Sequence, residues 1–133
     1  NNASDVKFQD SVKNFEKAFG SLKAAVVEPI TNQRDIAGLI KNFEFVYELS
    51  WIALKRLLEL EGRPTGTPKH VFSEAYVNGL ISDEQLWLEM IRDRNLTVHT
   101  YDDKLAKDMV ARIQKRYFPT FEALLALLKS KVK

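Results

Sequence analysis

The residues best suited to chemistry lie together in one short segment, Arg94–Tyr101. It contains the guanidinium of Arg94, the amide of Asn95, the imidazole of His99 and the phenol of Tyr101. An imidazole accepts or donates a proton near neutral pH, and a guanidinium stabilises negative charge as it develops. These residue types suit proton transfer at a site where negative charge develops or an anion is bound.

Arg94 is unusual because it interrupts an apolar helical stripe. The stripe consists of Trp87, Met90, Ile91, Val98 and Tyr101. An unpaired buried cation is costly, so we expect Arg94 to pair with an acidic residue, reach a cavity or face an anionic ligand. The simpler alternative is a snorkelling arginine near the end of a helix bundle.

The relative positions of Arg94 and His99 raise a geometric problem. Asn95 and His99 are four residues apart and share a helix flank, whereas Arg94 and His99 are about 140° apart on a regular helix. One straight helix cannot direct both side chains at one small atom. Two solutions remain open: the helix unwinds near Thr97, or two copies of the chain pack about a twofold axis and share a cleft.

Other polar residues have simpler interpretations. His70 is expected on the surface, and Asp83 and Glu84 are expected in the first turn of a helix, where a capping role explains them better than acid catalysis. A set of basic residues in the last helix is either a wall for RNA or, more simply, a solvated face. The set is Lys104, Lys107, Arg112, Lys115 and Arg116.

Composition excludes several classes of site and partner. The chain has 133 residues, no cysteine, only two histidines and a net charge of +2. We therefore predict no metal, no disulfide and no cofactor motif, and no strong overall field for nucleic acid. No apolar run approaches the length of a membrane span, so we expect a cytoplasmic protein with no membrane association.

Hydrophobic periodicity predicts four long helices and one short one. An apolar stripe from Phe8 to Val26 ends before Pro29, and a second helix is expected from about Asp35 to Glu61. Thr67-Pro68 predicts the start of a short helix with Tyr76 facing inward. Ser82 to Gln85 resembles a capping box for the fourth helix, and Asp102 predicts the cap of the last, which Pro119 should kink.

These elements predict an all-α fold: an up-and-down antiparallel four-helix bundle with an extra short helix, forming one domain over residues 1–133. The second helix carries an additional apolar flank, which predicts cover by another helix or another chain and hence a homodimer. This flank consists of Phe45, Leu49, Ile52 and Leu60.

The segment from Arg94 to Tyr101 resembles the Arg-x4-His-x-Tyr signature, with Asn95 after the arginine, of the HEPN superfamily (higher eukaryotes and prokaryotes nucleotide-binding). The run from Phe43 to Trp51 and the stretch from Ala75 to Trp87 resemble the branch called nucleotidyltransferase substrate-binding proteins. The resemblance covers most of residues 34–128.

The resemblance implies a homodimer built through the motif helices and encoded beside a small nucleotidyltransferase. In one interpretation the bundle is a toxin that acts as a metal-independent endoribonuclease, with Arg94 and His99 catalytic, Asn95 supporting and Tyr101 adenylylated by the partner. In the other it is a non-catalytic subunit that binds a nucleotide or another small substrate for the partner enzyme. A structural dimer with an incidental motif is the third and least favoured interpretation.

Overall fold

The structure is a computed structural model that describes residues 2–132. Helix α1 spans Asn2–Val27, α2 Gln33–Leu60, α3 Pro68–Val77, α4 Glu84–Leu96, α5 Asp103–Arg112 and α6 Phe118–Lys131. A 3-10 turn, η1 (Thr97–His99), follows α4, and a π-helical turn, η2 (Ile113–Tyr117), joins α5 to α6. The described residues contain no strand.

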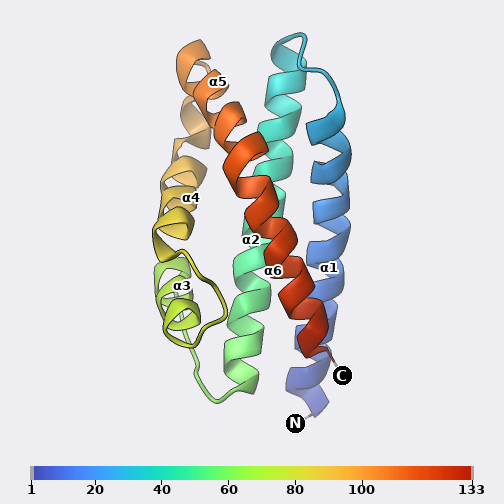
Figure 1. The fold of residues 1–133 in the computed structure, drawn as a ribbon, viewed down its shortest axis with the longest axis vertical. Coiled ribbons are helices and arrows are strands. Elements are labelled where there is room, and N and C mark those ends of the chain that lie inside the picture. The colour runs from blue at the N-terminus through green and yellow to red at the C-terminus, as the bar shows by residue number, and fades with distance from the viewer. Residues whose placement is uncertain (1, 133) are drawn as a thin grey trace.

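The helices run up and down in sequence order (Figure 1). α1 and α2 form a long antiparallel pair, α3 and α4 together fill the third position, and α5, η2 and α6 form the fourth. Both chain ends lie at one end of the bundle, and the turn between α4 and α5 lies at the other. The predicted four-helix bundle with one extra short helix is therefore confirmed.

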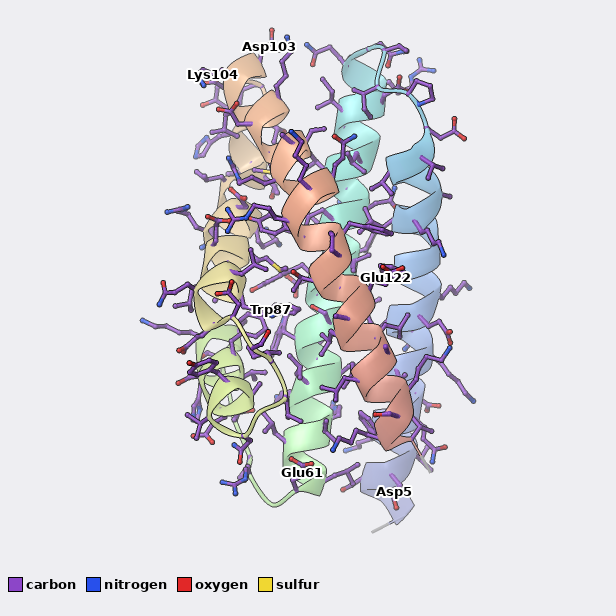
Figure 2. The ribbon with its side chains drawn as sticks, viewed as in Figure 1. Asp5, Glu61, Trp87, Asp103, Lys104 and Glu122 are labelled. Atoms are coloured by element: carbon purple, nitrogen blue, oxygen red, sulfur yellow. The ribbon has the colours of Figure 1, made fainter. Side chains whose placement is uncertain are left out.

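Aromatic side chains fill the core and fix the helices against one another. Phe43 of α2 stacks on Tyr117 with ring centroids 5.3 Å apart, and Trp87 of α4 contacts Phe72 at 4.8 Å and Phe121 at 5.8 Å. Trp87 is 1% exposed and lies between α4 and α6 (Figure 2). Since offset and edge-on ring pairs add to the free energy of burial, α4 is held in one rotation about its axis.

The irregularity expected at Pro119 occupies the turn before it. The Phe118 N–H donates to the Ile113 carbonyl, five residues back, in place of the usual four. A proline has no N–H and crowds the preceding turn, and the wider π turn accommodates both effects. The extra residue directs Tyr117 into the core, where it is fully buried.

Two inward positions and one cap were predicted wrongly. Tyr76 is 48% exposed because the ten-residue α3 buries one narrow face, and Val98 is 70% exposed because α4 ends before it. The cap of α4 is Asp83, which accepts from the Leu86 N–H at 3.1 Å, and not Ser82. The caps predicted at Thr67 and Asp102 are confirmed.

The cap at Asp83 gives a first prediction. Asp83→Ala is expected to lower the free energy of unfolding by about 1 kcal/mol because it leaves an amide of the first turn without its acceptor. Urea unfolding followed by circular dichroism measures the change. Ser82→Ala is the matched control and should be nearly neutral; a larger loss for Ser82→Ala would assign the cap to Ser82.

Candidate functional site

Arg94, in the last turn of α4, is paired with an acidic residue. Its Nε donates to Oε1 of Glu48 on α2 at 3.2 Å, and 34% of its side chain is exposed. The other carboxylate oxygen of Glu48 accepts a hydrogen bond from the Trp51 indole at 3.1 Å. Arg94 is thus held at a fixed orientation on the side of the bundle, with its two terminal nitrogens free of that ion pair.

The same residues line a surface groove of about 360 Å³ between α2, α4 and the start of α3. Arg94 and Asn95 enter it from α4, and Glu48 enters it from α2. The remaining lining residues are Tyr47, Trp51, Thr67, Pro68, Lys69 and Ile91. Arg94 therefore both pairs with an acid and reaches a cavity, which are two of the three environments expected for it.

Tyr47 presents a neutral phenol to this groove. Burial raises the pKa of Tyr47 above its usual range, the Glu48 carboxylate reinforces that shift, and the Arg94 guanidinium opposes it. These two charges act on the hydroxyl because it lies close to the Glu48 and Arg94 pair. The hydroxyl therefore keeps its proton throughout the neutral pH range.

The main chain changes geometry directly after the arginine. α4 ends at Leu96, and Thr97–His99 form the 3-10 turn η1. The Thr97 hydroxyl donates to the Arg94 carbonyl at 2.8 Å, and the Thr100 hydroxyl donates to the Thr97 carbonyl at 3.1 Å. The helix thus unwinds at Thr97, the position at which the sequence analysis allowed for a change of geometry.

His99 and Tyr101 meet on this exposed turn. The His99 Nδ1 lies 3.3 Å from the Tyr101 hydroxyl, and the two rings are edge-on with centroids 5.8 Å apart. Tyr101 is 81% exposed. Within the described chain, the structure brings together His99 with Tyr101 and Arg94 with Asn95, but it records no contact between Arg94 and His99.

A buried network behind Arg94 is absent from the sequence prediction. Asp93, 1% exposed, accepts two hydrogen bonds from Arg112, at 2.7 Å to Nε and 2.8 Å to a terminal nitrogen. The Tyr117 hydroxyl donates to the same carboxylate at 2.5 Å. The carboxylate raises the Arg112 pKa, and burial raises the Tyr117 pKa, so both partners stay protonated. Asp93 follows the buried Leu86 and Met90 at helical spacing, and this spacing is the sequence signal that would have placed it in the core.

Most of the basic side chains that were considered as an RNA-binding surface are engaged in ion pairs. Arg112 binds Asp93, Arg116 binds Glu89 at 2.6 Å, and Lys104 binds Asp108 at 2.9 Å. Three of the five basic side chains are therefore paired with carboxylates of the bundle. The simpler interpretation of a solvated face fits these contacts better than an RNA-binding wall does.

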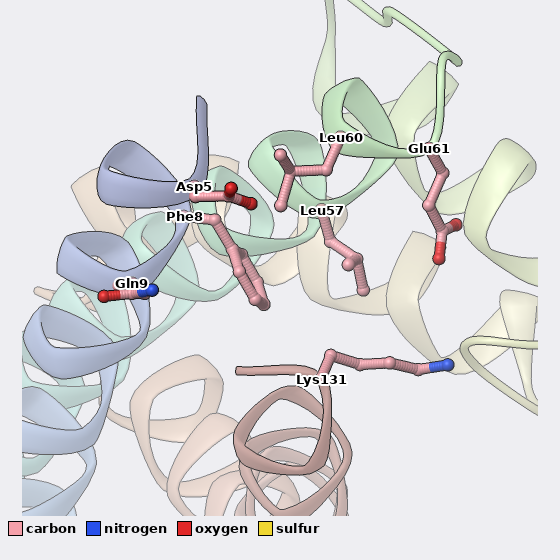
Figure 3. A pocket seen from close by; sticks show the side chains of 7 residues that line it. All are labelled: Asp5, Phe8, Gln9, Leu57, Leu60, Glu61 and Lys131. Atoms are coloured by element: carbon pink, nitrogen blue, oxygen red, sulfur yellow. The ribbon is translucent and has the colours of Figure 1, made fainter. Parts of the chain in front are cut away.

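A second cavity, of about 350 Å³, lies at the far end of the bundle (Figure 3). Its apolar lining is Phe8, Leu57 and Leu60, and charged side chains of both signs stand at its edge. Asp5 and Glu61 mark this end in Figure 2, whereas Asp103 and Lys104, next to the candidate residues, mark the opposite end. This cavity contains none of the candidate site residues.

The described residues contain neither a candidate metal site nor a helix suited to spanning a membrane. They contain no group of three or more histidine, cysteine, aspartate or glutamate side chains placed to hold a metal ion. Within the same part of the chain, no helix combines the length and the apolar character that crossing a bilayer requires.

Comparison with known proteins gives a consistent family. Residues 10–130 match the family model described as "Nucleotidyltransferase substrate binding protein like". A Haemophilus influenzae protein named "Probable ribonuclease HepT" is 36% identical, over 74% of this chain and 78% of that protein.

Solved structures agree on the fold. One from Haemophilus influenzae, described as the fold of a substrate binding domain of a nucleotidyltransferase, is 34% identical, covers 89% of this chain and 98% of its own, and has a TM-score of 0.80. A second, the tri-AMPylated Shewanella oneidensis HEPN toxin in complex with the MNT antitoxin, is 15% identical with a TM-score of 0.75 and covers 92% and 96% of the two chains. At that identity the likeness concerns the fold alone.

Proposed function

The chain belongs to the nucleotidyltransferase substrate-binding protein family, and from this membership we propose that it is the toxin half of a two-gene toxin-antitoxin module and a metal-independent endoribonuclease. Its relative named as a probable ribonuclease supports this function. The observation that carries it is the His99–Tyr101 contact in the exposed segment that follows α4, the helix that carries Arg94.

His99 is the proton-transfer residue of the proposed reaction. Its Nδ1 faces the Tyr101 hydroxyl, which leaves Nε2 to accept the proton of an RNA 2'-hydroxyl. The 2'-oxygen then attacks the adjacent phosphorus, the bond from phosphorus to the 5'-oxygen breaks, and a 2',3'-cyclic phosphate and a 5'-hydroxyl form.

Arg94 stabilises the charge that develops on the phosphorane. Because Glu48 holds only its Nε, both terminal nitrogens are available to two phosphate oxygens. Asn95, which lines the same groove, supplies an amide to orient the phosphate or the imidazole. Glu48 is a positioning residue here, since it acts through Arg94.

A homodimer supplies the second acid-base group. One imidazole cannot easily act both as the base for the 2'-hydroxyl and as the acid for the leaving 5'-oxygen in a single turnover. A twofold dimer contains two copies of both His99 and Arg94, so a second imidazole is available. The Phe45 and Val98 side chains, 57% and 70% exposed, provide apolar surface on α2 and within η1 for this contact. We therefore propose that paired protomers share one cleft.

Tyr101 is the proposed control point. Its hydroxyl is exposed beside His99, within reach of a second enzyme. Transfer of AMP to it by a small nucleotidyltransferase encoded alongside would add bulk and negative charge next to the imidazole and silence cleavage. The proposed RNA substrate and nucleotide donor favour the cytoplasm as the location of this module.

RNA cleavage without metal tests the proposal. The purified protein is incubated with total cellular RNA in EDTA, and the products are resolved by denaturing electrophoresis. We expect cleavage by the wild type and its loss, by about 10²- to 10⁴-fold, in His99→Ala, because general acid-base catalysis contributes that much. Arg94→Ala should fall comparably, because it removes the cation that stabilises the phosphorane.

The chain provides matched controls for both variants. His70→Ala and Arg92→Ala remove the same side-chain types from exposed positions outside the groove, and they should cleave like the wild type. Absence of cleavage by the wild type, or full activity in His99→Ala, would reject the ribonuclease.

The groove favours a second candidate function. Its volume and its lining by Arg94, Asn95 and Tyr47 suit a nucleotide, so the chain would act as the binding subunit of a two-component nucleotidyltransferase. In that case the partner performs the transfer, and nucleotide binding persists without any RNA cleavage.

A further inference from the structure

The groove between α2 and α4 is lined by a buried tyrosine, Tyr47. Tyr47 is 2% exposed, yet among the described residues its hydroxyl has no hydrogen-bond partner. Tyr47 lines the groove together with Glu48 and Arg94. A buried hydroxyl is rarely left unpaired, so this one is available to a ligand.

Glu48 supplies acceptor capacity beside it. Each carboxylate oxygen carries two lone pairs, and the two hydrogen bonds from Arg94 and Trp51 occupy one on each oxygen. The other two remain, and 42% of the Glu48 side chain is exposed. The groove therefore offers a pair of acceptors next to one hydroxyl donor.

The rest of the lining suits a planar base. Trp51 and Ile91 are half-buried and give the groove apolar walls together with Pro68. Aromatic and apolar side chains of this kind stack on the unpaired bases of single-stranded RNA. About 360 Å³ is enough for a nucleoside, and Arg94 at the edge can hold the attached phosphate.

We propose that this groove binds the guanine base of the nucleotide whose 3'-phosphate is cleaved. The Glu48 carboxylate accepts the N1–H and N2–H groups of guanine, and the Tyr47 hydroxyl donates to O6. Guanine is the one RNA base with two adjacent parallel N–H donors beside an acceptor, so a carboxylate discriminates it from adenine, cytosine and uracil. The inference rests on the proposed ribonuclease function and adds its base preference.

Binding of mononucleotides tests the inference without relying on catalysis. The full chain is titrated in EDTA with 3'-GMP, 3'-AMP, 3'-CMP and 3'-UMP by isothermal titration calorimetry. We expect 3'-GMP to bind at least about tenfold more tightly than the other three, the discrimination typical of one bidentate contact. Equal affinities, or a preference for 3'-AMP, would overturn the proposal.

Two variants separate recognition from folding. Tyr47→Phe and Glu48→Gln should each weaken 3'-GMP binding about tenfold relative to the other three nucleotides and so remove the preference, because any displacement of Arg94 in Glu48→Gln affects the phosphate of all four alike. Tyr47→Phe removes an atom without a partner, so its melting temperature should be no lower than that of the wild type. Tyr76→Phe and Glu59→Gln, at exposed positions outside the groove, should bind like the wild type. A guanine preference that survives in both test variants contradicts the assignment.

The same samples distinguish this inference from the proposed function. RNA cleavage in EDTA with no enrichment of guanine at the new 3' ends overturns the base preference and leaves the ribonuclease intact. Selective binding of 3'-GMP with no cleavage of any RNA rejects the ribonuclease and retains a guanine-nucleotide site in a binding subunit.

Discussion

Replacing Asp93 with alanine is expected to lower the free energy of unfolding by about 3 kcal/mol. Asp93 is 1% exposed and accepts from both Arg112 and Tyr117, so its loss leaves a guanidinium and a phenol without their acceptor inside the bundle. Breaking one side of a buried ion pair typically costs about 3 to 5 kcal/mol, and the lower value applies because 28% of the Arg112 side chain reaches solvent.

Urea unfolding with fluorescence detection measures this loss. Asp108→Ala is the matched control, because it removes a carboxylate from an exposed pair with Lys104 and should change the free energy of unfolding far less than Asp93→Ala does. A loss for Asp93→Ala as small as that of the control would mean that Arg112 and Tyr117 find other partners. Asp93 would then have no part in holding α4 against the last helix.

Mixing two inactive variants is expected to restore cleavage if the proposed dimer shares its catalytic residues. A mixed dimer of Arg94→Ala with His99→Ala keeps one Arg94 and one His99 in the shared cleft, whereas a dimer of either variant alone has lost both copies of one residue. After unfolding and refolding an equimolar mixture, half of the dimers are mixed, so activity recovers to a fraction, at most about half, of the wild type. Each variant alone remains at least about 10²-fold reduced.

The controls for this experiment are the same variants refolded separately and then combined without exchange, which should stay inactive. No recovery in a sample shown by mass spectrometry to contain mixed dimers would place both residues in one chain. The turn after Leu96 would then have to bring His99 towards Arg94 within a single protomer.

The sequence predicted the elements that local chemistry controls. Helical periodicity gave the long helices, and Thr67 and Asp102 gave two of the caps, since a cap depends on the next three residues of the same chain. Pro119 predicted a break in the last helix, because the loss of one N–H and the clash with the preceding turn are properties of that residue.

The wrong predictions on α4 share one cause. Val98 was assigned to the buried stripe by continuing a regular helix beyond Leu96, although the chain turns into 3-10 geometry there. The buried charged residue on this helix is Asp93. It lies one position before Arg94, the charged residue that the sequence analysis placed on the apolar face. A shift of one residue rotates the assigned face by about 100°, so periodicity alone does not distinguish these two neighbours.

The sequence by itself determined the family, the order of the helices and the expectation that Arg94 must pair with an acid, reach a cavity or face an anionic ligand. Only the tertiary structure decided which acid it finds and what surrounds the pair. Glu48 lies 46 positions before Arg94, and Arg112 lies 19 positions after Asp93. Which side chains meet across such separations depends on the rotation and packing of whole helices, and the aromatic contacts of Trp87 and Tyr117 in the core set that rotation.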